Sequence, residues 1–457
     1  MNFLSRIILP SACAMLTAIP VNAQHPDLND ERLQNLELEY VGRDVEKSGA
    51  YVYRDLTYFY LFASHTTGWT AGDGCVSTTL PDGNSLWCFG DSFFGFISEN
   101  RNRTRPSVLA RNAGMIQTGE ESWHDFIDLN EYITTDPRDR DRYYKAKTWL
   151  RHPEGNLSQK EVDNGGSDSN YCYWPGDGTV IMKNGKPVVQ YIWGAVDNTM
   201  TPYERSIAEY SLEGKPGDPG YMKLIELHRH TPDIGTSHDR IFEDEDGYSY
   251  LYGSVGTGGL GAWVHVARVA NHDLLSPWEF YVKDEQGNWS WTTKVPTTEE
   301  YQRSRISDDF NINISVFKYA GKYFMVNMLM TGSPIYISIA DHPWGPFTQQ
   351  KCLYRIPAEH AAAYITCVHP QLSKTGEIVV SYNMNPADLK RYTPKGDGTA
   401  EEHIDNGFWR NFNAPESADL YQSHFVRIFN WQKLYGIPNE GPIKEPNFVA
   451  IPELLNR

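Results

Sequence analysis

Five hairpin-like units recur along the chain and limit its possible folds more than any other feature. Each unit combines a short β pattern, a tight turn that contains glycine, and an apolar strand. The units occupy Asp73–Asp91, Tyr173–Trp193, His238–Ser254, Asn313–Met330 and His369–Asn383. Glycine and asparagine supply the positive φ that such turns need. The series predicts an all-β chain, a five-bladed β-propeller over residues 51–430 with these hairpins as blade centres. A β-sandwich is the alternative, but it would not predict five similar units in series.

The N-terminus has the order of a secretory signal peptide. A short segment with one cation, Met1–Arg6, precedes a largely apolar stretch and the small residues Val21-Asn22-Ala23. This pattern predicts a signal peptide over residues 1–23, and hence a secreted or periplasmic protein. Cys13 raises the question of a lipid anchor, but the residues before it fit a lipoprotein signal poorly. We therefore expect no lipid anchor and no membrane span.

The rest of the chain divides by composition. We expect residues 24–50 to be a lead-in segment and the proline- and asparagine-rich residues 431–457 to be a strap over the surface. Three polar stretches are expected to be loops on one rim: residues 100–106, 135–166 and 284–307.

The charge and the aromatic content indicate the class of partner. The chain carries 58 Asp and Glu against 41 Lys and Arg, a formal net charge of −17. This balance argues against binding nucleic acid or an anionic membrane. The 13 Trp and 28 Tyr suit a sugar ligand, because sugar rings stack on aromatic faces, although aromatic residues also fill cores. A neutral polysaccharide or oligosaccharide is therefore the expected partner of a monomeric protein.

The cysteines and acidic runs give no metal motif. Five cysteines remain after the predicted leader, and their spacing matches no zinc site; they are Cys75, Cys88, Cys172, Cys352 and Cys367. The first two flank one hairpin and could form a disulfide, whereas buried free thiols are expected for most. The run Glu243–Gly247 fails as a calcium loop, because Phe242 would stand at the first ligand position. We expect no cofactor and assign no metal ligand, and a cation on the propeller axis stays open.

Asp73 and Asp91 are the most informative residues. A three-residue turn at Pro81-Asp82-Gly83 makes Leu80 and Asn84 a closing pair, and counting outward from that pair places Asp73 opposite Asp91. Facing like charges destabilise a hairpin, so a fold that keeps them uses them or binds a cation between them. Glycoside hydrolysis needs such a carboxylate pair. Solvated turn aspartates are the alternative.

Several motifs resemble a family of bacterial secreted five-bladed propellers that includes endo-D-arabinanases. They are Gly72-Asp73-Gly74, Leu80–Gly83, Trp87–Gly95 with Phe89-Gly90-Asp91, Arg111-Asn112-Ala113, Tyr173–Gly178, Asn313–Val316 and His369-Pro370. The resemblance runs from about residue 51 to residue 430 and implies that Asp73 and Asp91 are the catalytic pair. Ser92 and Phe93 stand where the family often has Thr-Trp, a departure that affects the sugar subsite more than the chemistry.

Further residues are candidates for binding the substrate. Trp69, Trp174 and Trp193 are interpreted as stacking platforms, Asn112 and Asp177 as contacts to hydroxyl groups, and Asp239, Asn313 and His369 as residues that line the pocket. One residue of Asp308-Asp309 can also point inward, since neighbours on a strand face opposite sides. A buried or structural role is the alternative for each.

These observations predict a secreted glycoside hydrolase that cleaves arabinofuranosyl bonds, as in D-arabinan. Asp91 is the expected nucleophile and Asp73 the general acid/base. Directly opposed residues have Cβ atoms about 5 Å apart, which favours the retaining mechanism over the inverting one. A non-catalytic glycan-binding propeller is the main alternative. A lyase acting on an acidic polymer would need a basic groove, against which the net charge of −17 argues.

Overall fold

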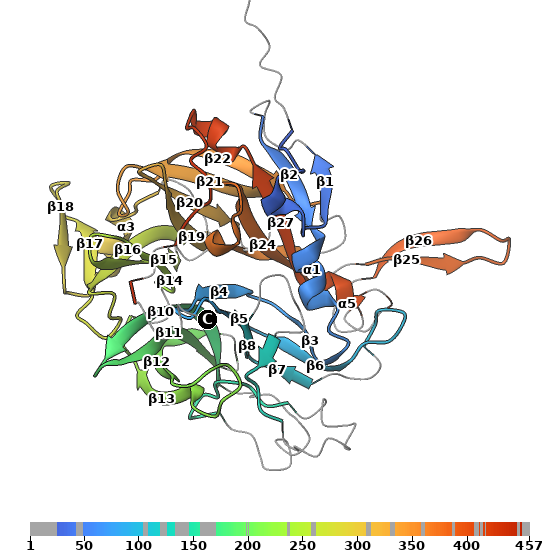
Figure 1. The fold of residues 1–457 in the computed structure, drawn as a ribbon, viewed down its shortest axis with the longest axis horizontal. Coiled ribbons are helices and arrows are strands. Elements are labelled where there is room, and N and C mark those ends of the chain that lie inside the picture. The colour runs from blue at the N-terminus through green and yellow to red at the C-terminus, as the bar shows by residue number, and fades with distance from the viewer. Residues whose placement is uncertain are drawn as a thin grey trace, which may run out of the picture.

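The computed structural model is a five-bladed β-propeller (Figure 1). It describes residues 25–42, 49–103, 108–118, 126–132, 146–155, 171–197, 199, 201–234, 238–256, 262–307, 312–329, 334–357, 362–385, 389–405, 411, 415, 417–445 and 448–449. The predicted leader and Asp308-Asp309 lie outside these residues.

The first three blades follow one another along the chain. Blade I contains β4 (Val76–Thr79), β5 (Ser85–Phe89), β8 (Ala113–Gln117) and β9 (Phe126–Asp128). Its inner hairpin is prolonged by a small sheet of β3 (Thr67–Gly72), β6 (Ser92–Phe96) and β7 (Val108–Ala110). Blade II contains β10 (Tyr171–Lys183), β11 (Lys186–Asp197), β12 (Pro202–Leu212) and β13 (Tyr221–Arg229). Blade III contains β14 (Arg240–Glu243), β15 (Tyr248–Gly256), β16 (Ala262–Ala270), β17 (Glu279–Lys283) and β18 (Trp289–Thr292).

The last two blades complete the ring and join the two ends of the chain. Blade IV contains β19 (Ile312–Tyr319), β20 (Lys322–Met328), β21 (Pro334–Ala340) and β22 (Thr348–Arg355). Blade V is ordered β23 (Ala362–Val368), β24 (Ile378–Asn385), β27 (Ser423–Phe429), β2 (Tyr51–Asp55) and β1 (Leu38–Gly42). The segment expected as a lead-in therefore supplies the outermost strand of this blade. A ribbon of β25 (Leu389–Pro394) and β26 (Ala400–Asp405) projects away from the ring (Figure 1).

Each of the five predicted hairpins forms the two innermost strands of one blade. Turn chemistry fixes their ends: Asn184 and Gly185 have φ of 53° and 75° between β10 and β11. Ala320 and Gly321 also have positive φ, of 49° and 71°, in the turn between β19 and β20. Hydrophobic clusters lie between neighbouring blades, so each blade buries both of its faces.

Ring closure rests on a buried ion-pair network. Arg427 in β27 donates hydrogen bonds to Asp55 at 2.6 Å and to Glu377 at 2.5 Å. All three groups are buried, and a buried guanidinium is stable only when anions pair with it. Asp55 also accepts from Tyr58 N at 2.9 Å, which caps α1 (Leu56–Ala63). The pairing of the first and last strands is therefore fixed by charge as well as by backbone bonds.

The remaining helices are short, and one of them lies in a segment that was predicted to be a loop. Residues 284–307 are not simply a loop, since they form β18 and α3 (Thr298–Arg303), whose capping box links Thr297 and Glu300. The other short elements are α5 (Ser417–Leu420) and the 3₁₀ turns η1 (Glu31–Leu33), η4 (Pro370–Leu372) and η5 (Trp431–Tyr435). Among the described residues, no helix is both long and apolar enough to cross a membrane.

Candidate active site

The inner hairpin of blade I brings the two aspartates together as the register predicts. Leu80 N donates to Asn84 O at 2.9 Å, which closes the turn between β4 and β5. At the other end of the hairpin, Asp73 N donates to Asp91 O at 3.2 Å and Gly90 N donates to Asp73 O at 2.7 Å. Asp73 and Asp91 therefore face each other where β3 gives way to β4 and β5 to β6. Both are partly exposed.

The glycines before the aspartates are needed for close packing within the protein. A Cβ on Gly90 would lie 2.5 Å from Asp73 Oδ1, and a Cβ on Gly72 would lie 2.6 Å from Ser92 Oγ. Both distances are too short for non-bonded atoms. The space above Gly90 is thus filled by the carboxylate of Asp73. Their effect is to hold the two carboxylates near each other.

Asp91 has a cation and a ring donor as partners. Arg111 Nη1 donates to Asp91 Oδ2 at 3.1 Å, and Trp174 Nε1 donates to Oδ1 at 3.4 Å. The Asp91 side chain is 22 % exposed and that of Arg111 14 %. Burial raises the pKa of Asp91, while the Arg111 charge and the Trp174 hydrogen bond oppose that rise. Both contacts favour the ionised carboxylate.

The side chain of Asp73 accepts a hydrogen bond from a neutral donor. Tyr364 OH, from β23 of blade V, donates to Asp73 Oδ2 at 2.9 Å. Burial, and then the charge of Asp91, raise the pKa of Asp73 to about 7, against the lowering effects of Tyr364, Tyr421 and the more distant charge of Arg111. A carboxyl group with such a pKa carries a proton through part of the neutral range. The pair therefore contains one group suited to hold a proton and one suited to stay ionised.

Blade V also fixes the backbone of both aspartates. Asn383 Oδ1 accepts from Gly74 N at 3.1 Å, and Asn383 Nδ2 donates to Gly72 O at 3.2 Å. Tyr421 OH donates to Asp91 O at 2.9 Å. The first blade is thereby locked against the last at the point where the two carboxylates meet.

Three predicted binding residues are partly exposed, and one of them contacts this pair. Trp174 is half-buried and contacts Asp91 through its indole nitrogen. Asp239 is partly exposed, and its backbone oxygen and Cβ pack closely on Gly176, two residues after Trp174. Asn313 is partly exposed at the bulge that opens β19, with φ of 57°. Their binding roles remain predictions.

Four other predicted binding residues are structural. Trp69 and Trp193 are 2 % and 0 % exposed and pack within hydrophobic clusters, so their ring faces contact protein. Asn112 is fully buried, and its amide bonds Leu150 and the Tyr173 carbonyl. His369 is fully buried between Ser77 Oγ at 2.7 Å and Ser381 Oγ at 2.8 Å, which occupies both ring nitrogens. All four side chains are buried, which contradicts the prediction that they contact the substrate. A short motif does not reveal whether a side chain is buried.

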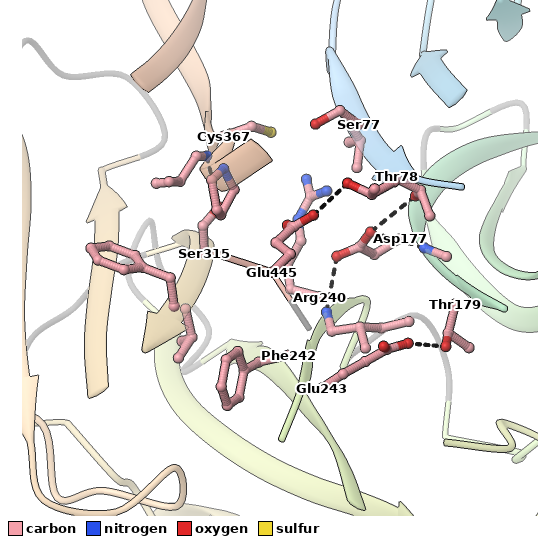
Figure 2. A pocket seen from close by; sticks show the side chains of 18 of the residues that line it. Ser77, Thr78, Asp177, Thr179, Arg240, Phe242, Glu243, Ser315, Cys367 and Glu445 are labelled. Carbon is pink, nitrogen blue, oxygen red and sulfur yellow. Dashed lines mark hydrogen bonds between the residues drawn. The ribbon is translucent and has the colours of Figure 1, made fainter. Parts of the chain in front are cut away.

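A second group of carboxylates lies farther along the axis, around a cavity of ≈ 110 Å³ (Figure 2). Asp177, Glu243 and Glu445 line it, and burial raises their pKa values to about 6, 8 and 7. Asp177 Oδ2 accepts from Ile241 N at 3.1 Å, and Thr78 Oγ1 lies 3.5 Å from Asp177 Oδ1. Asp177, which the sequence predicted to contact a substrate hydroxyl, therefore lines this cavity. Thr179 donates to Glu243, and Thr79 donates to Glu445 at 2.6 Å. Neither Asp73 nor Asp91 lines this cavity.

The strap segment contributes residues to the lining of the cavity. Lys444, Glu445 and Phe448 are among its lining residues, together with the inner strands of the five blades. Upstream, Tyr319 OH donates to Asn439 Oδ1 at 2.8 Å, and Ile443 N donates to Ser373 Oγ at 3.1 Å. The C-terminal segment thus crosses the turn ends of the inner hairpins.

Metal-ligating side chains converge at one place in the described part of the chain. Glu209, Glu226 and His228 lie on the outer strands of blade II with ligand atoms within 4.8 Å of one another. Lys183 Nζ already contacts Glu209 at 2.5 Å and neutralises it. Cys75 and Cys88 are both free thiols, so they do not form the disulfide considered above.

Sequence reasoning did not assign Arg111, Tyr364, Tyr421 or Asn383 to the site. Arg111 stands directly before Asn112 in a motif that the resemblance had singled out, so a local signal existed. The other three come from blade V, and each lies about 290 or more positions from the aspartate segment that it contacts. Only the closure of the ring brings them there.

Comparisons with known proteins identify a matching family and several similar solved structures. The model of the family described as a domain of unknown function, DUF5005, matches residues 55–431. A crystal structure from Bacteroides ovatus, of a protein to which a hydrolase function has been attributed, is 39 % identical with a TM-score of 0.78 and covers 92 % of this chain and 100 % of that chain. The GH43_1 enzyme from Xanthomonas citri is 16 % identical, with a TM-score of 0.36, and covers 75 % of this chain and 95 % of that chain. The β-xylosidase/α-arabinofuranosidase CoXyl43 from a compost metagenome is 15 % identical, with a TM-score of 0.36, and covers 74 % of this chain and 94 % of that chain.

No curated protein matches the sequence. The family model spans most of the chain, from the end of β2 to the start of η5. The chain belongs to the DUF5005 family.

Proposed function

We propose that this protein is a glycoside hydrolase in which Asp73 and Asp91 carry out bond cleavage. The observation behind the proposal is that the two facing carboxylates have unlike surroundings. Asp91 accepts from Arg111 and Trp174, whereas Asp73 accepts from the neutral Tyr364. Glycoside hydrolysis needs this division of labour, with one protonated carboxyl group and one carboxylate. The hydrolase function attributed to the Bacteroides ovatus protein is consistent with it.

In this proposal Asp91 is the nucleophile and Asp73 the acid and base. The Asp91 carboxylate attacks the anomeric carbon while Asp73 gives its proton to the leaving oxygen, which breaks the glycosidic bond. Asp73 then takes a proton from a water molecule, and the resulting hydroxide equivalent displaces the sugar from Asp91. A pKa of Asp73 of about 7 supports both steps near neutral pH. The roles follow from the direct contact of Arg111 with Asp91, whereas Asp73 is bonded by the neutral Tyr364.

The spacing of the pair supports retention of the anomeric configuration. Opposed residues of an antiparallel pair have Cβ atoms about 5 Å apart, near the roughly 5–5.5 Å between carboxyl groups of retaining enzymes. Asp73 Oδ1 lies 2.5 Å from the position that a Cβ on Gly90, the residue before Asp91, would take. Such a gap has no room for a water molecule between carboxylate and sugar.

Arabinofuranosyl bonds, as in D-arabinan, are the substrate that we propose. The basis is the sequence resemblance around Asp73 and Asp91, together with Trp174 as an aromatic platform next to Asp91. We further propose that a signal peptide directs the protein to the periplasm or the exterior, where it acts as a monomer on a polysaccharide. This location follows from the pattern of residues 1–23.

A substrate screen tests the proposal. Purified protein is incubated with arabinans and plant-wall polysaccharides, and the products are sized by chromatography. We expect shortened chains from an arabinan, and none from the same substrate with Asp73→Asn or Asp91→Asn. Binding to a glycan without cleavage by the wild type would instead support a non-catalytic glycan-binding propeller.

A further inference from the structure

A buried guanidinium lies between blades II and III and has no assigned role. Arg205 in β12 is fully buried, and none of its three side-chain nitrogens makes a hydrogen bond in the described structure. Burial lowers the pKa of Arg205 to about 10, so the group is a cation at neutral pH. An unpaired buried cation is unfavourable unless a counter-charge approaches it.

Two further polar atoms near Arg205 also have no partner in the described structure. They are the hydroxyl of Tyr301 in α3 and Nε2 of His265 in β16. The rings of Tyr301 and His265 are 4.9 Å apart, and the charge of Arg205 lowers the pKa of Tyr301 against the larger raising effect of burial. His265 Nδ1 lies 3.0 Å from the carbonyl of Ser304 and must donate to it, so Nε2 of the neutral ring is an acceptor.

Arg205 shares its nearby carboxylate with a second guanidinium group. Asp239 is the carboxylate whose charge acts on Arg205, and the same carboxylate also acts on Arg240. His238 is buried, and burial together with the charges of His265 and Arg205 keeps its pKa well below the usual range, so it is neutral. Two guanidinium groups thus share Asp239, although Arg240 has Asp177 as a second anion.

This group of residues is linked through Asp239 to the segment that contacts Asp91. Asp239 packs on Gly176, in the same segment as Trp174, which contacts Asp91. Gly253 makes room for the chain at His238, because a Cβ on Gly253 would lie 2.0 Å from His238 N. His238 itself has φ of 63°, an unfavourable conformation for a residue with a side chain.

We propose that Arg205 and Tyr301 form a binding site for a small anion, a carboxylate or a halide, beside the active site. The planar guanidinium matches a carboxylate with two parallel hydrogen bonds, and the Tyr301 hydroxyl supplies a third donor. A hydroxyl group next to the carboxylate would donate to His265 Nε2, as in a sugar acid, whereas a halide cannot. The anion can come from an acidic sugar of the glycan or from free halide. The inference does not depend on the hydrolase activity, because the site is defined by binding.

Thermal unfolding in defined salts tests this site. The melting temperature is measured with sodium chloride, sodium bromide, sodium glucuronate and uncharged glucose for wild type, Arg205→Met and Arg54→Met. Arg54 is an exposed arginine that pairs with Glu39, so its variant is the matched control. Wild type and Arg54→Met are expected to gain about 2–5 °C at saturating anion and nothing with glucose. Arg205→Met should lose this response.

The pattern of responses identifies the source of the anion. A response to chloride and bromide indicates a free halide, and a response to glucuronate alone indicates a sugar carboxylate; either supports the site. Equal responses of wild type and Arg205→Met overturn it. If Arg205→Met does not fold, wild-type crystals soaked in bromide and in glucuronate decide the matter. Density for either within hydrogen-bonding distance of Arg205 supports the site, and its absence in both soaks overturns it.

Discussion

The two groups of carboxylates along the propeller axis have the same chemistry but different surroundings. Asp73 and Asp91 lie at the start of the inner hairpin of blade I, and Glu243 and Glu445 line the cavity near the hairpin turns. Burial raises the pKa of every one of these four groups. A raised pKa alone therefore does not distinguish a site of chemistry from a structural carboxylate.

The difference lies in the partners. Near the turns, threonine hydroxyls donate hydrogen bonds to Glu243 and Glu445. At the other end, Arg111 donates to Asp91, whereas the neutral Tyr364 donates to Asp73. An asymmetric pair can exchange a proton with a substrate, whereas carboxylates satisfied by hydroxyls alone stabilise the fold.

The largest expected effect separates these two groups directly. Asp73→Asn and Asp91→Asn should each lower kcat on the polysaccharide by roughly 10²–10⁴-fold or more, because Asn is neither an acid, a base nor an effective nucleophile. Glu445→Gln, which neutralises a carboxylate of the other group, should keep nearly full activity. Initial rates of reducing-end release measure all three. Similar losses in all three variants would erase the distinction.

Arg111→Met tests the asymmetry within the pair. Loss of the cation should raise the pKa of Asp91, since the Arg111 charge holds it down. The acidic limb of the pH profile of kcat/KM should then move toward neutral pH. The rate should fall about 10- to 100-fold, the value of a charge-assisted hydrogen bond of roughly 1.5–3 kcal/mol. An unchanged acidic limb would show that Arg111 does not set the charge of Asp91.

The sequence predicted features that depend on local spacing and missed those that depend on ring closure. The Pro81-Asp82-Gly83 turn fixes the register through Leu80 and Asn84, so the facing aspartates could be predicted. Burial was harder to predict from the sequence. Trp193 and Trp174 belong to the same pair of strands, yet Trp193 lies in the core and Trp174 beside Asp91. The direction of each side chain in a twisted, bulged hairpin decides whether it is buried, and composition does not reveal that direction.

Tyr364 could not be found locally, because β23 reaches Asp73 only after blade V has closed on blade I. Asn383 is equally remote and holds the backbone on both sides of Asp73. In a propeller the innermost strands of all blades converge on one axis, so residues far apart in the chain share one site.

Tyr364→Phe should have a smaller effect, confined to the basic limb. The hydroxyl favours the charged form of Asp73, so its loss should raise the pKa of Asp73 above about 7. Because Asp73 must be protonated to act as the acid, the basic limb of kcat/KM should move to higher pH. The pH profile from 5 to 10 measures this, with Tyr40→Phe, an exposed tyrosine, as the control. A shift of the basic limb to lower pH would contradict the assignment of Asp73.

The smallest effect concerns stability near the hairpin turns. Glu445 has a pKa of about 7 in the folded state, above its usual 4.5, so the folded state binds more protons than the unfolded one between these values. Stability should therefore decrease as pH rises from about 4.5 to above 7. Glu445→Gln should reduce that decrease, and the exposed Glu440→Gln should not. Melting temperatures at pH 5, 7 and 8.5 measure this, and equal pH dependence of both variants would contradict it.

The central claim is that Asp91 attacks the sugar while Asp73 handles the proton, and mass spectrometry of a trapped intermediate tests it most directly. Asp73→Asn is mixed with an activated aryl glycoside of the sugar found in the substrate screen, whose leaving group needs no acid. The variant should form a glycosyl-enzyme that accumulates, because no base remains to activate water. The account predicts a peptide that carries the sugar on Asp91. Release of the aryl group without an adduct, or an adduct on another residue, would contradict it.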